Sequence, residues 1–472
     1  MELKSVLTAL ICLLLLILFH FKKGDKKKEI LLILCILIIG YFNFQVLVIV
    51  LFISLINFYL SRKITLSLSV LEKKYSFFLA IIFNCSIFFY FKLEDVLFET
   101  GIFDSKHIFL ALGMSFYTLN NMAFIIDTYK KRIDYEVTFE NLLLSNLYFP
   151  KFISGPIISV GDFSKQLSNI GFREIDLSIG LKRILYGLIK KMVIADRLSE
   201  TVIYNFDIHP HDFGLTNLFV AFLFAIQLYF DFSGYSDIAI GVSRIFGITL
   251  PENFNFPFKS TTITEFWRRW HITLTSWLST YVYYPISFYF RKKRFFGVVI
   301  ALIVTFIVSG IWHGLHGSLL IYALMHATFL IIEFVLSKIG FVNLRFIPRW
   351  IGSTFGRIYV FCIVSLSFIF LRNTNWEKSL LITKSIFNSN SFQPTNFFND
   401  FIAKLATGGE LDLVFNFYIT VLLVLFFMLF NKRMTYLVHQ EKFYWIYFIV
   451  GILLIVLFGQ FVNRTQFIYS QF

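Results

Sequence analysis

The strongest constraint on this chain is a series of apolar blocks long enough to cross a lipid bilayer. A transmembrane helix needs roughly 20 apolar residues, and a shorter block can complete a crossing by tilting or by recruiting flanking residues. Because backbone amides have no water to bond inside lipid, the blocks are predicted to be helices. They are Ile108–Ile126, Phe219–Phe230, Phe296–Trp312, Ser318–Ser337, Arg357–Leu371, Val414–Leu429 and Trp445–Phe461.

Composition supports the same class of protein. Of the 472 residues, 57% are hydrophobic and 15% are charged, against about 25% charged in soluble domains. A net charge of +14 would suggest a nucleic-acid partner in a soluble protein. Here the basic residues cluster between apolar blocks, as in cytoplasmic loops, so no nucleic-acid partner is expected. The sequence predicts an all-α polytopic membrane protein with about eleven transmembrane helices, in contact with membrane lipid.

Basic segments predict a topology, because such segments stay in the cytoplasm. They are Phe21–Ile30, Ser61–Tyr75, Arg291–Arg294, Arg345–Arg349 and Lys432–Lys442. The block Leu31–Leu60 must then cross twice, as a hairpin broken near Asn43–Gln45, or not at all. The first block, Val6–Phe19, lacks a small-residue cleavage site and is predicted to be a retained helix. This topology puts both chain termini and the loop Asn373–Asp412 on the exported side.

The middle third of the chain, residues 138–290, differs from the rest. Polar, Gly and Pro residues interrupt its apolar sequence, as in Phe149–Ile157 (FPKFISGPI) and Pro251–Pro257 (PENFNFP). Such segments are tolerated at membrane depth where protein buries them or water reaches them. We therefore expect short re-entrant or interfacial helices around a tunnel. The predicted division is membrane helices in residues 1–105, the tunnel core in 106–371, and an exported loop, two helices and a tail in 372–472.

Two carboxylates lie in apolar sequence within Tyr229–Gly241 (YFDFSGYSDIAIG). A buried carboxylate is costly unless it is paired. The basic residues nearest in sequence are Arg244, Arg268 and Arg269. Asp231 and Asp237 therefore belong either to a structural ion-pair network or to a substrate-binding site, and both readings stay open.

The motif Trp267–His271 (WRRWH) combines aromatic and basic side chains. Its rings are expected to form a belt at the membrane interface, while Arg268 and Arg269 are candidates to contact phosphates of a donor. His271 is open to either a structural hydrogen bond or a catalytic role.

A second candidate histidine lies in Ser309–Gly317 (SGIWHGLHG), at the end of a long apolar block. Glycines on both sides of His313 would let another chain or a substrate approach the imidazole closely. Together with neighbouring Trp312, a candidate substrate-binding residue, they favour a functional role of His313 over a structural hydrogen bond. His316 and His326 lack this setting and are expected to be structural. The four cysteines have no paired spacing, so neither a disulfide frame nor a metal site is expected.

The sequence resembles the membrane-bound O-acyltransferase family, and within it the bacterial alginate and peptidoglycan O-acetyltransferases. The resemblance runs from Gly113 to the C-terminus. It rests on GMSFYTLNNMAFIIDTYK (Gly113–Lys130), FPKFISGPI, KKMVIADRL (Lys190–Leu198), YFDFSGYSDIAIG, NFNFPFKSTTITEFWRRWHITLTSWL and SGIWHG. It implies that His313 is the family's invariant histidine and that His271 is its second polar-site histidine. Asn120 and Asn121 depart from the family pattern, and no function is assigned to them.

The implied reaction is acyl transfer from a cytoplasmic thioester to an exported cell-envelope polysaccharide, at the bacterial plasma membrane. Such a reaction needs a base for the hydroxyl proton and donors for the developing oxyanion, and imidazole suits the first task. The expected donor is acetyl-CoA or an acyl carrier protein, with no bound cofactor and with an exported SGNH-type acyltransferase as partner. A D-alanyl transferase of teichoic acids is the alternative within the family. Outside it, the alternatives are a proton-coupled transporter, which the lack of an internal repeat disfavours, and a non-catalytic scaffold.

The chain ends in Phe467–Phe472 (FIYSQF). Its F-x-Y-x-x-F spacing resembles a terminal motif of this family, in which the tyrosine takes the acyl group and passes it on. Tyr469 is therefore a candidate acyl relay, against the alternative of a hydrophobic tail that packs on the last helix.

Overall fold

The computed structural model describes most of the chain as helix. The described residues are 11, 14–15, 17–21, 24–99, 113–133, 136–168, 170–171, 174–203, 206, 214–339, 349–373, 375–387, 420–427 and 445–461. Every regular element among them is helical, which confirms the all-α prediction. Six of these helices are long and apolar enough to cross a bilayer: α3 (Phe44–Leu66), α4 (Val70–Glu99), α10 (Gly214–Ile245), α14 (Phe295–His313), α15 (Gly317–Lys338) and α16 (Arg349–Arg372).

The helices form two compact units that are discontinuous in sequence. The first unit comprises residues 1–184 and 238–251, and the second comprises residues 185–237 and 252–472. Two helices, α8 (Glu174–Leu188) and α10, each contribute residues to both units. The three-part division predicted from the sequence follows the order of the motifs, and it stays a prediction.

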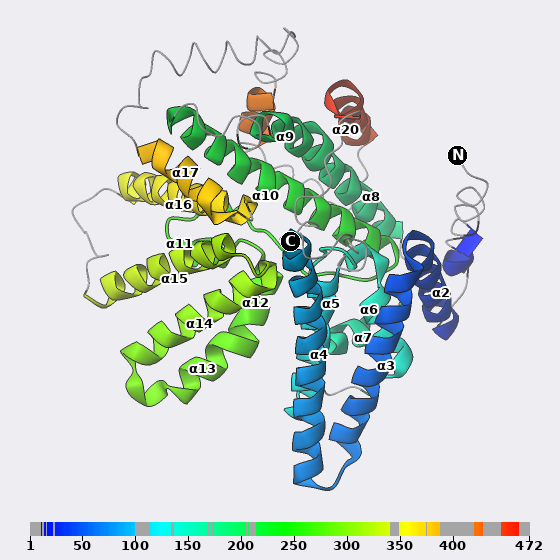
Figure 1. The fold of residues 1–472 in the computed structure, drawn as a ribbon. Helices are drawn as coiled ribbons and strands as arrows, with labels where there is room; N and C mark the ends of the chain where they lie inside the picture. The colour runs from blue at the N-terminus through cyan, green and yellow to red at the C-terminus, as the bar shows by residue number, and fades with distance from the viewer. Residues whose placement is uncertain are drawn as a thin grey trace. The chain divides into compact units, whose positions relative to one another are not determined.

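The first unit opens with α2 (Asp25–Phe42) and α3, which are separated at Asn43. The Asn43 side chain accepts a hydrogen bond from the Val46 amide at 3.0 Å and so caps α3. The break predicted near Asn43–Gln45 is therefore confirmed. After the short link Ser67–Ser69 the chain reverses into α4, beside α3 (Figure 1). The apolar blocks identified from the sequence did not include α4.

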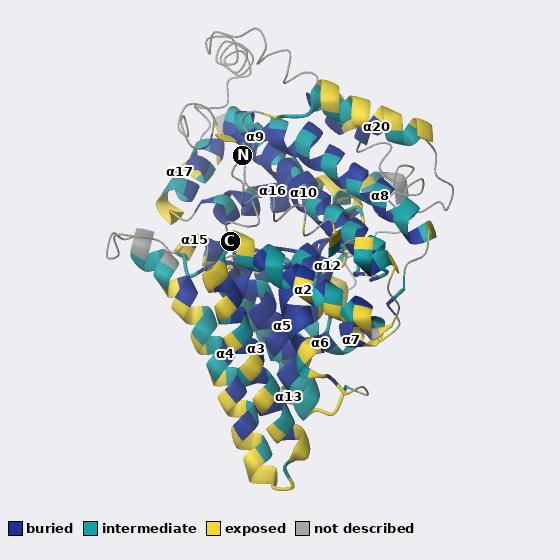
Figure 2. Cartoon of the chain, turned by 90° about the vertical axis from the view of Figure 1, so that its right-hand side faces the viewer, coloured by how far each residue is buried: buried dark blue, intermediate teal, exposed yellow. Residues whose placement is uncertain are grey.

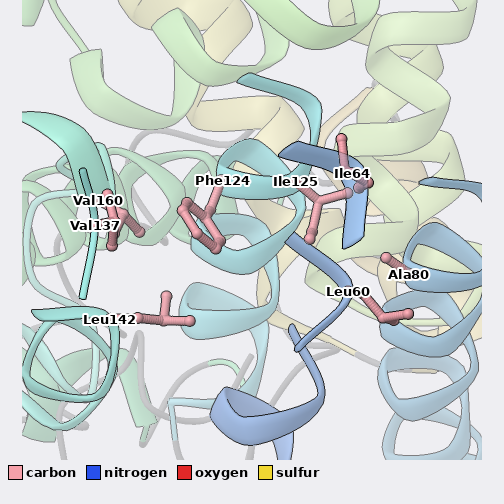
Figure 3. Close-up of a cluster of buried hydrophobic side chains, with 8 residues drawn as sticks. All are labelled: Leu60, Ile64, Ala80, Phe124, Ile125, Val137, Leu142 and Val160. Atoms are coloured by element: carbon pink, nitrogen blue, oxygen red, sulfur yellow. The ribbon is translucent and has the colours of Figure 1, made fainter. Parts of the chain in front are cut away.

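The first unit has a hydrophobic core between these long helices and three shorter ones. The shorter helices are α5 (Met114–Tyr129), α6 (Phe139–Leu147) and α7 (Val160–Leu167). Figure 3 shows the buried side chains that meet there, namely Leu60, Ile64, Ala80, Phe124, Ile125, Val137, Leu142 and Val160. Because α6 and α7 are too short to cross a bilayer, packing against α3 and α5 holds them in place.

Buried amides also join the helices of the first unit. Asn84 on α4 donates to Asn57 on α3 at 2.7 Å. Asn146 on α6 donates to Ser54 at 2.9 Å and to Asn121 at 3.1 Å. Inter-helix hydrogen bonds of this kind help membrane helices to associate. Asn121, which received no functional weight in the sequence, thus has a structural role.

Short helices and two π-helical turns dominate the polar stretch of the second unit. They are η2 (Ile189–Ala195), α9 (Asp196–Ile203), η4 (Pro257–Lys259), α11 (Ile263–Trp267), α12 (Ile272–Leu278), η5 (Ser279–Tyr283), α13 (Tyr284–Tyr289) and η6 (Arg291–Lys293). This agrees with the short helices predicted for the middle third. The short block Phe219–Phe230 recruits flanking residues on both sides, as expected, and is part of one continuous helix, α10. Its polar residues are tolerated because 72% of its apolar window is buried, against 33–44% in the other five candidate spans.

Glycines set the spacing between α8 and α10 in each unit. In the first unit, a Cβ on Gly241 would lie 2.7 Å from the Gly180 carbonyl oxygen. In the second, a Cβ on Gly234 would lie 2.9 Å from the Gly187 carbonyl oxygen. Real Cβ atoms do not approach so closely, so these glycines permit backbone-to-backbone contact.

The second unit continues with α14, α15, α16 and α17 (Trp376–Phe387). The last helix that the structure describes is α20 (Trp445–Phe458). Figure 2 shows that α20 is largely exposed along its length, and its exposed side chains are apolar, as in Trp445, Ile446 and Leu457. One face is anchored, because Gly451 lies against Leu185. An exposed apolar helix of this kind is expected to face lipid.

Candidate active site

His313 is the last residue of α14, and its side chain is buried. A Cβ on Gly310 would lie 2.9 Å from the Cβ of Ala323, and one on Gly314 would lie 2.8 Å from a methyl group of Leu319. The two glycines therefore admit the first turns of α15. The close approach predicted at these glycines is made by a neighbouring helix of the same chain.

His271 lies at the start of α12 in the left-handed backbone region, with φ 41°. This conformation is uncommon for residues other than glycine. The backbone around it is fixed, because the Ile272 amide donates to the Asn253 carbonyl at 2.9 Å. The Thr273 hydroxyl also donates to the Asn253 side chain, at 2.6 Å. Such conformations persist only where the surroundings enforce them, and they occur preferentially at active sites.

Trp312 joins the two histidines into one buried cluster. Its ring centroid lies 4.7 Å from that of His313 and 5.9 Å from that of His271. The His271 ring also contacts Phe232 on α10, with ring centroids 4.7 Å apart. Residues predicted from two separate motifs are thus brought together.

The buried cluster also lowers the pKa of His271. Burial lowers the pKa of this imidazole well below its usual range, and the nearby His313 lowers it further. His271 is therefore neutral at physiological pH, and its ring is near enough to His313 for the two to interact electrostatically.

The predicted interfacial belt of tryptophans is wrong. Trp267 and Trp270 are both buried within the second unit. Trp270 stacks on Phe266 with centroids 5.4 Å apart, and the indole N–H of Trp267 donates to His326 Nδ1 at 3.2 Å. The aromatic residues fill the centre of the unit because the short helices around them leave a space that large rings occupy.

His326 is structural, as predicted. Its Nδ1 accepts from Trp267, so the proton is on Nε2, which lies 2.9 Å from the Ser367 hydroxyl. This chain of hydrogen bonds connects α11, α15 and α16, and it satisfies both ring nitrogens of a fully buried histidine.

A cavity of about 570 Å³ lies in the same unit, among α11, α12, α13, α14 and α15. This volume is in the range of sites for small molecules and cofactors. Along α14 the wall runs from Val298 to Ser309, which is roughly 16 Å of helix. The imidazole of His313 lies on the same helix, one turn beyond Ser309.

The cavity wall distinguishes the two neighbouring arginines. Arg268 lines the cavity and is exposed. Arg269 does not line it, because its guanidinium is paired with Glu265 at 2.9 Å and donates to the Asn255 carbonyl at 3.1 Å. Of the two, the structure leaves Arg268 to contact a ligand.

Glu333 is the acidic member of the wall. Its carboxylate accepts from the Thr264 amide at 2.9 Å and the Thr264 hydroxyl at 2.8 Å, at the start of α11. It thus fixes the helix that presents Arg268. Glu333 was not among the candidates predicted from the sequence, although a lone carboxylate within an apolar membrane block is a usable signal.

The partners predicted for Asp231 and Asp237 were wrong. Lys191 pairs with Asp231 at 2.6 Å, and Lys190 pairs with Asp237 at 2.6 Å. Lys191 also contacts Asp196 at 2.8 Å. The lysines reach these carboxylates because the π-helical turn η2 places adjacent residues toward α10.

The arginines expected as partners are paired elsewhere: Arg244 with Asp176, and Arg269 with Glu265. The buried pairs of the aspartates match the structural alternative. A role of Asp231 and Asp237 in substrate binding stays a prediction.

Tyr469 lies outside the described residues, so its predicted role stays a prediction. Within the described part of the chain, no three His, Cys, Asp or Glu side chains gather in a group that could bind a metal ion. The chemistry that this part of the chain brings together is therefore a pair of buried imidazoles near a cavity of mixed polarity.

Comparison with known proteins gives consistent matches. Residues 130–372 match the family model described as the membrane-bound O-acyltransferase family. A peptidoglycan O-acetyltransferase of Helicobacter pylori is 30% identical over 71% of this chain and 68% of its own length. The probable alginate O-acetylase AlgI of Azotobacter vinelandii is 33% identical over 60% of this chain and 54% of its own length. A teichoic acid D-alanyltransferase of Bacillus subtilis is 34% identical over 46% of this chain and 57% of its own length.

Proposed function

Because the chain belongs to the membrane-bound O-acyltransferase family, we propose that it moves an acetyl group from a cytoplasmic thioester across the membrane for O-acylation of an exported cell-envelope polysaccharide. The peptidoglycan and alginate relatives support an acetyl group and a polysaccharide acceptor. The observation that carries the proposal is the position of buried His313 one helical turn beyond a large cavity.

The chemistry follows from this arrangement. The imidazole of His313 takes the proton of the acceptor hydroxyl as its oxygen attacks the thioester carbonyl carbon. The carbon–sulfur bond then breaks, and the imidazolium returns the proton to the leaving thiolate. His271 stays neutral and acts through Trp312, which keeps the ring of His313 in position.

The cavity is proposed to bind the pantetheine arm of the donor. This arm is common to acetyl-CoA and to an acyl carrier protein, and the cavity has the volume for it. The cavity wall on α14 begins one turn after the basic segment Arg291–Arg294, which the positive-inside pattern assigns to the cytoplasm. The thioester would then lie at the deeper end, toward His313.

The acyl group and the acceptor are tested in cells with and without the active protein. Mild alkali releases ester-linked groups from the envelope polysaccharide, and loss of acetate is the expected result. Loss of D-alanine instead would favour the alternative that the Bacillus subtilis relative supports, a D-alanyl transferase supplied by a carrier protein.

Replacing Arg268 with alanine is expected to raise the KM for acetyl-CoA about tenfold or more and to change kcat little. A charged hydrogen bond to a donor phosphate contributes roughly 1.5–3 kcal/mol, and this term is lost from ground-state binding. Arg269→Ala is the matched control, because Arg269 is paired with Glu265 and lies off the cavity wall. An unchanged KM with a lowered kcat in the Arg268 variant would contradict the phosphate contact.

We further propose that Tyr469 accepts the acyl group with the help of His313 and passes it to an exported SGNH-type acyltransferase. A phenol is a competent oxygen nucleophile once its proton is removed, and its ester remains activated for a second transfer. Tyr469→Phe keeps the ring and removes only the oxygen, so polymer acetylation should fall to background. Acetylation at the normal rate in this variant would exclude the relay.

The proposed setting is a bacterial plasma membrane, with about eleven membrane helices, of which an even number cross completely, so that both chain termini lie on the exported side. The six long helices supply the main crossings. The basic segments between them support the orientation.

A further inference from the structure

Ser309 is unusual among the hydroxyl groups of the second unit. Its side chain is 1% exposed, and its Oγ has no hydrogen-bond partner within the protein. Buried polar groups are almost always hydrogen-bonded, and each exception calls for an explanation. Membrane helices usually satisfy serine and threonine through a carbonyl one turn earlier. On this same helix Thr305 does so, donating to the Ala301 carbonyl at 2.6 Å.

The cavity wall makes Ser309 more distinctive. Every other serine and threonine that lines the cavity is hydrogen-bonded within the protein; these are Thr262, Thr264, Thr275, Ser279, Thr305 and Ser337. Five more described Ser or Thr hydroxyls are buried without a partner, but none of them lines this cavity. Ser309 therefore combines a buried, unpartnered hydroxyl with a position on the cavity wall.

The position of Ser309 along α14 matches the reacting group. Residues four apart on a helix lie on one face, with Cβ atoms about 5–6 Å apart. Ser309 and His313 are related in this way, with Ser309 on the side of the cavity. A thioester carbonyl between the two would have the base near its carbon and the hydroxyl near its oxygen.

We propose that the Ser309 hydroxyl donates a hydrogen bond to the carbonyl oxygen of the bound thioester and stabilises the oxyanion formed during transfer. This inference rests on the proposed function and assigns a catalytic residue to the same site. As the acceptor oxygen bonds to the carbonyl carbon, the negative charge moves to the carbonyl oxygen and the proton moves to His313. The charge returns when the carbon–sulfur bond breaks, and Ser309 leaves the cycle unchanged.

The test compares turnover of acetyl-CoA, with envelope polysaccharide as acceptor, in variants of the full-length protein. Ser309→Ala should lower kcat about 10²-fold, the effect of losing one oxyanion donor, with little change in the KM for acetyl-CoA. Ser309→Thr keeps a hydroxyl and should recover most of the rate. Ser365→Ala is the matched control, since Ser365 on α16 is also buried and unpartnered but lies off the cavity wall, and it should keep the normal rate.

Four results would overturn the proposal. A normal kcat in Ser309→Ala beside an inactive His313→Ala would refute the role of Ser309 and leave the proposed function intact. Normal rates in both variants would refute the proposed function as well. A raised KM with unchanged kcat would show that Ser309 only binds the donor, and a threonine variant no faster than alanine would show that the hydroxyl does not matter.

Discussion

Replacing His313 with alanine should abolish polymer acetylation while the protein remains in the membrane at its normal level. General-base catalysis contributes about 10²–10⁴ to a rate, and here the imidazole is the base nearest the end of the cavity along α14. The protein should still fold, because the close packing of Gly310 on α14 against Ala323 on α15 is left in place by the substitution. The measurement is ester-linked acetate on the polysaccharide, with protein level followed in the same membranes.

His316→Ala is the control for this experiment. His316 lies three residues further along the same motif, at the start of α15 and outside the buried cluster. This variant should keep the normal rate of acetylation. Normal acetylation in His313→Ala would remove the central claim of an acyltransferase site at this histidine.

Replacing His271 should produce the second large effect, a fall in kcat of about 10²-fold, the loss that follows a misplacement of roughly 1 Å at a reacting group. The neutral ring contacts both Phe232 and Trp312, and Trp312 in turn contacts His313. Removing the ring leaves space into which Trp312 can move, so the base loses its fixed orientation.

The choice of variant matters because of the backbone at His271. Alanine adds strain at φ 41°, whereas asparagine tolerates the left-handed region. His271→Asn therefore removes the imidazole with the backbone intact, and it should show the loss of rate at a normal protein level.

The pH dependence provides a check on this role. Since burial lowers the pKa of His271 well below its usual range, its protonation occurs only in more acidic solution. Any loss of activity between pH 7 and 6 must come from another group, and it should persist in His271→Asn. If the His271→Asn variant no longer lost activity between pH 7 and 6, this result would show that His271 itself titrates near neutrality.

Sequence alone determined the class of the fold. Apolar blocks of bilayer length can only be helical inside lipid, so α14 and α15 lie within one residue of their predicted bounds. The end of α16 was predicted equally well, but the helix begins eight residues before its predicted start. The break at Asn43 was equally local, because one asparagine side chain caps the following helix. The full length of α10 and the whole of α4 were not predicted from the apolar blocks. Whether a polar or aromatic-rich segment stays helical depends on what packs against it.

The candidate active site was likewise predicted only in part from the sequence. Sequence identified His271, Trp312 and His313, because buried titratable and aromatic residues in apolar sequence are informative wherever they occur. Only the tertiary structure brought these residues into one cluster, paired Asp231 and Asp237 with lysines, and separated Arg268 from Arg269. It alone distinguished Ser309 from the other serines. The reason is physical: a residue's type is set by the sequence, but its hydrogen-bond partners and its access to a cavity are set by segments far away along the chain.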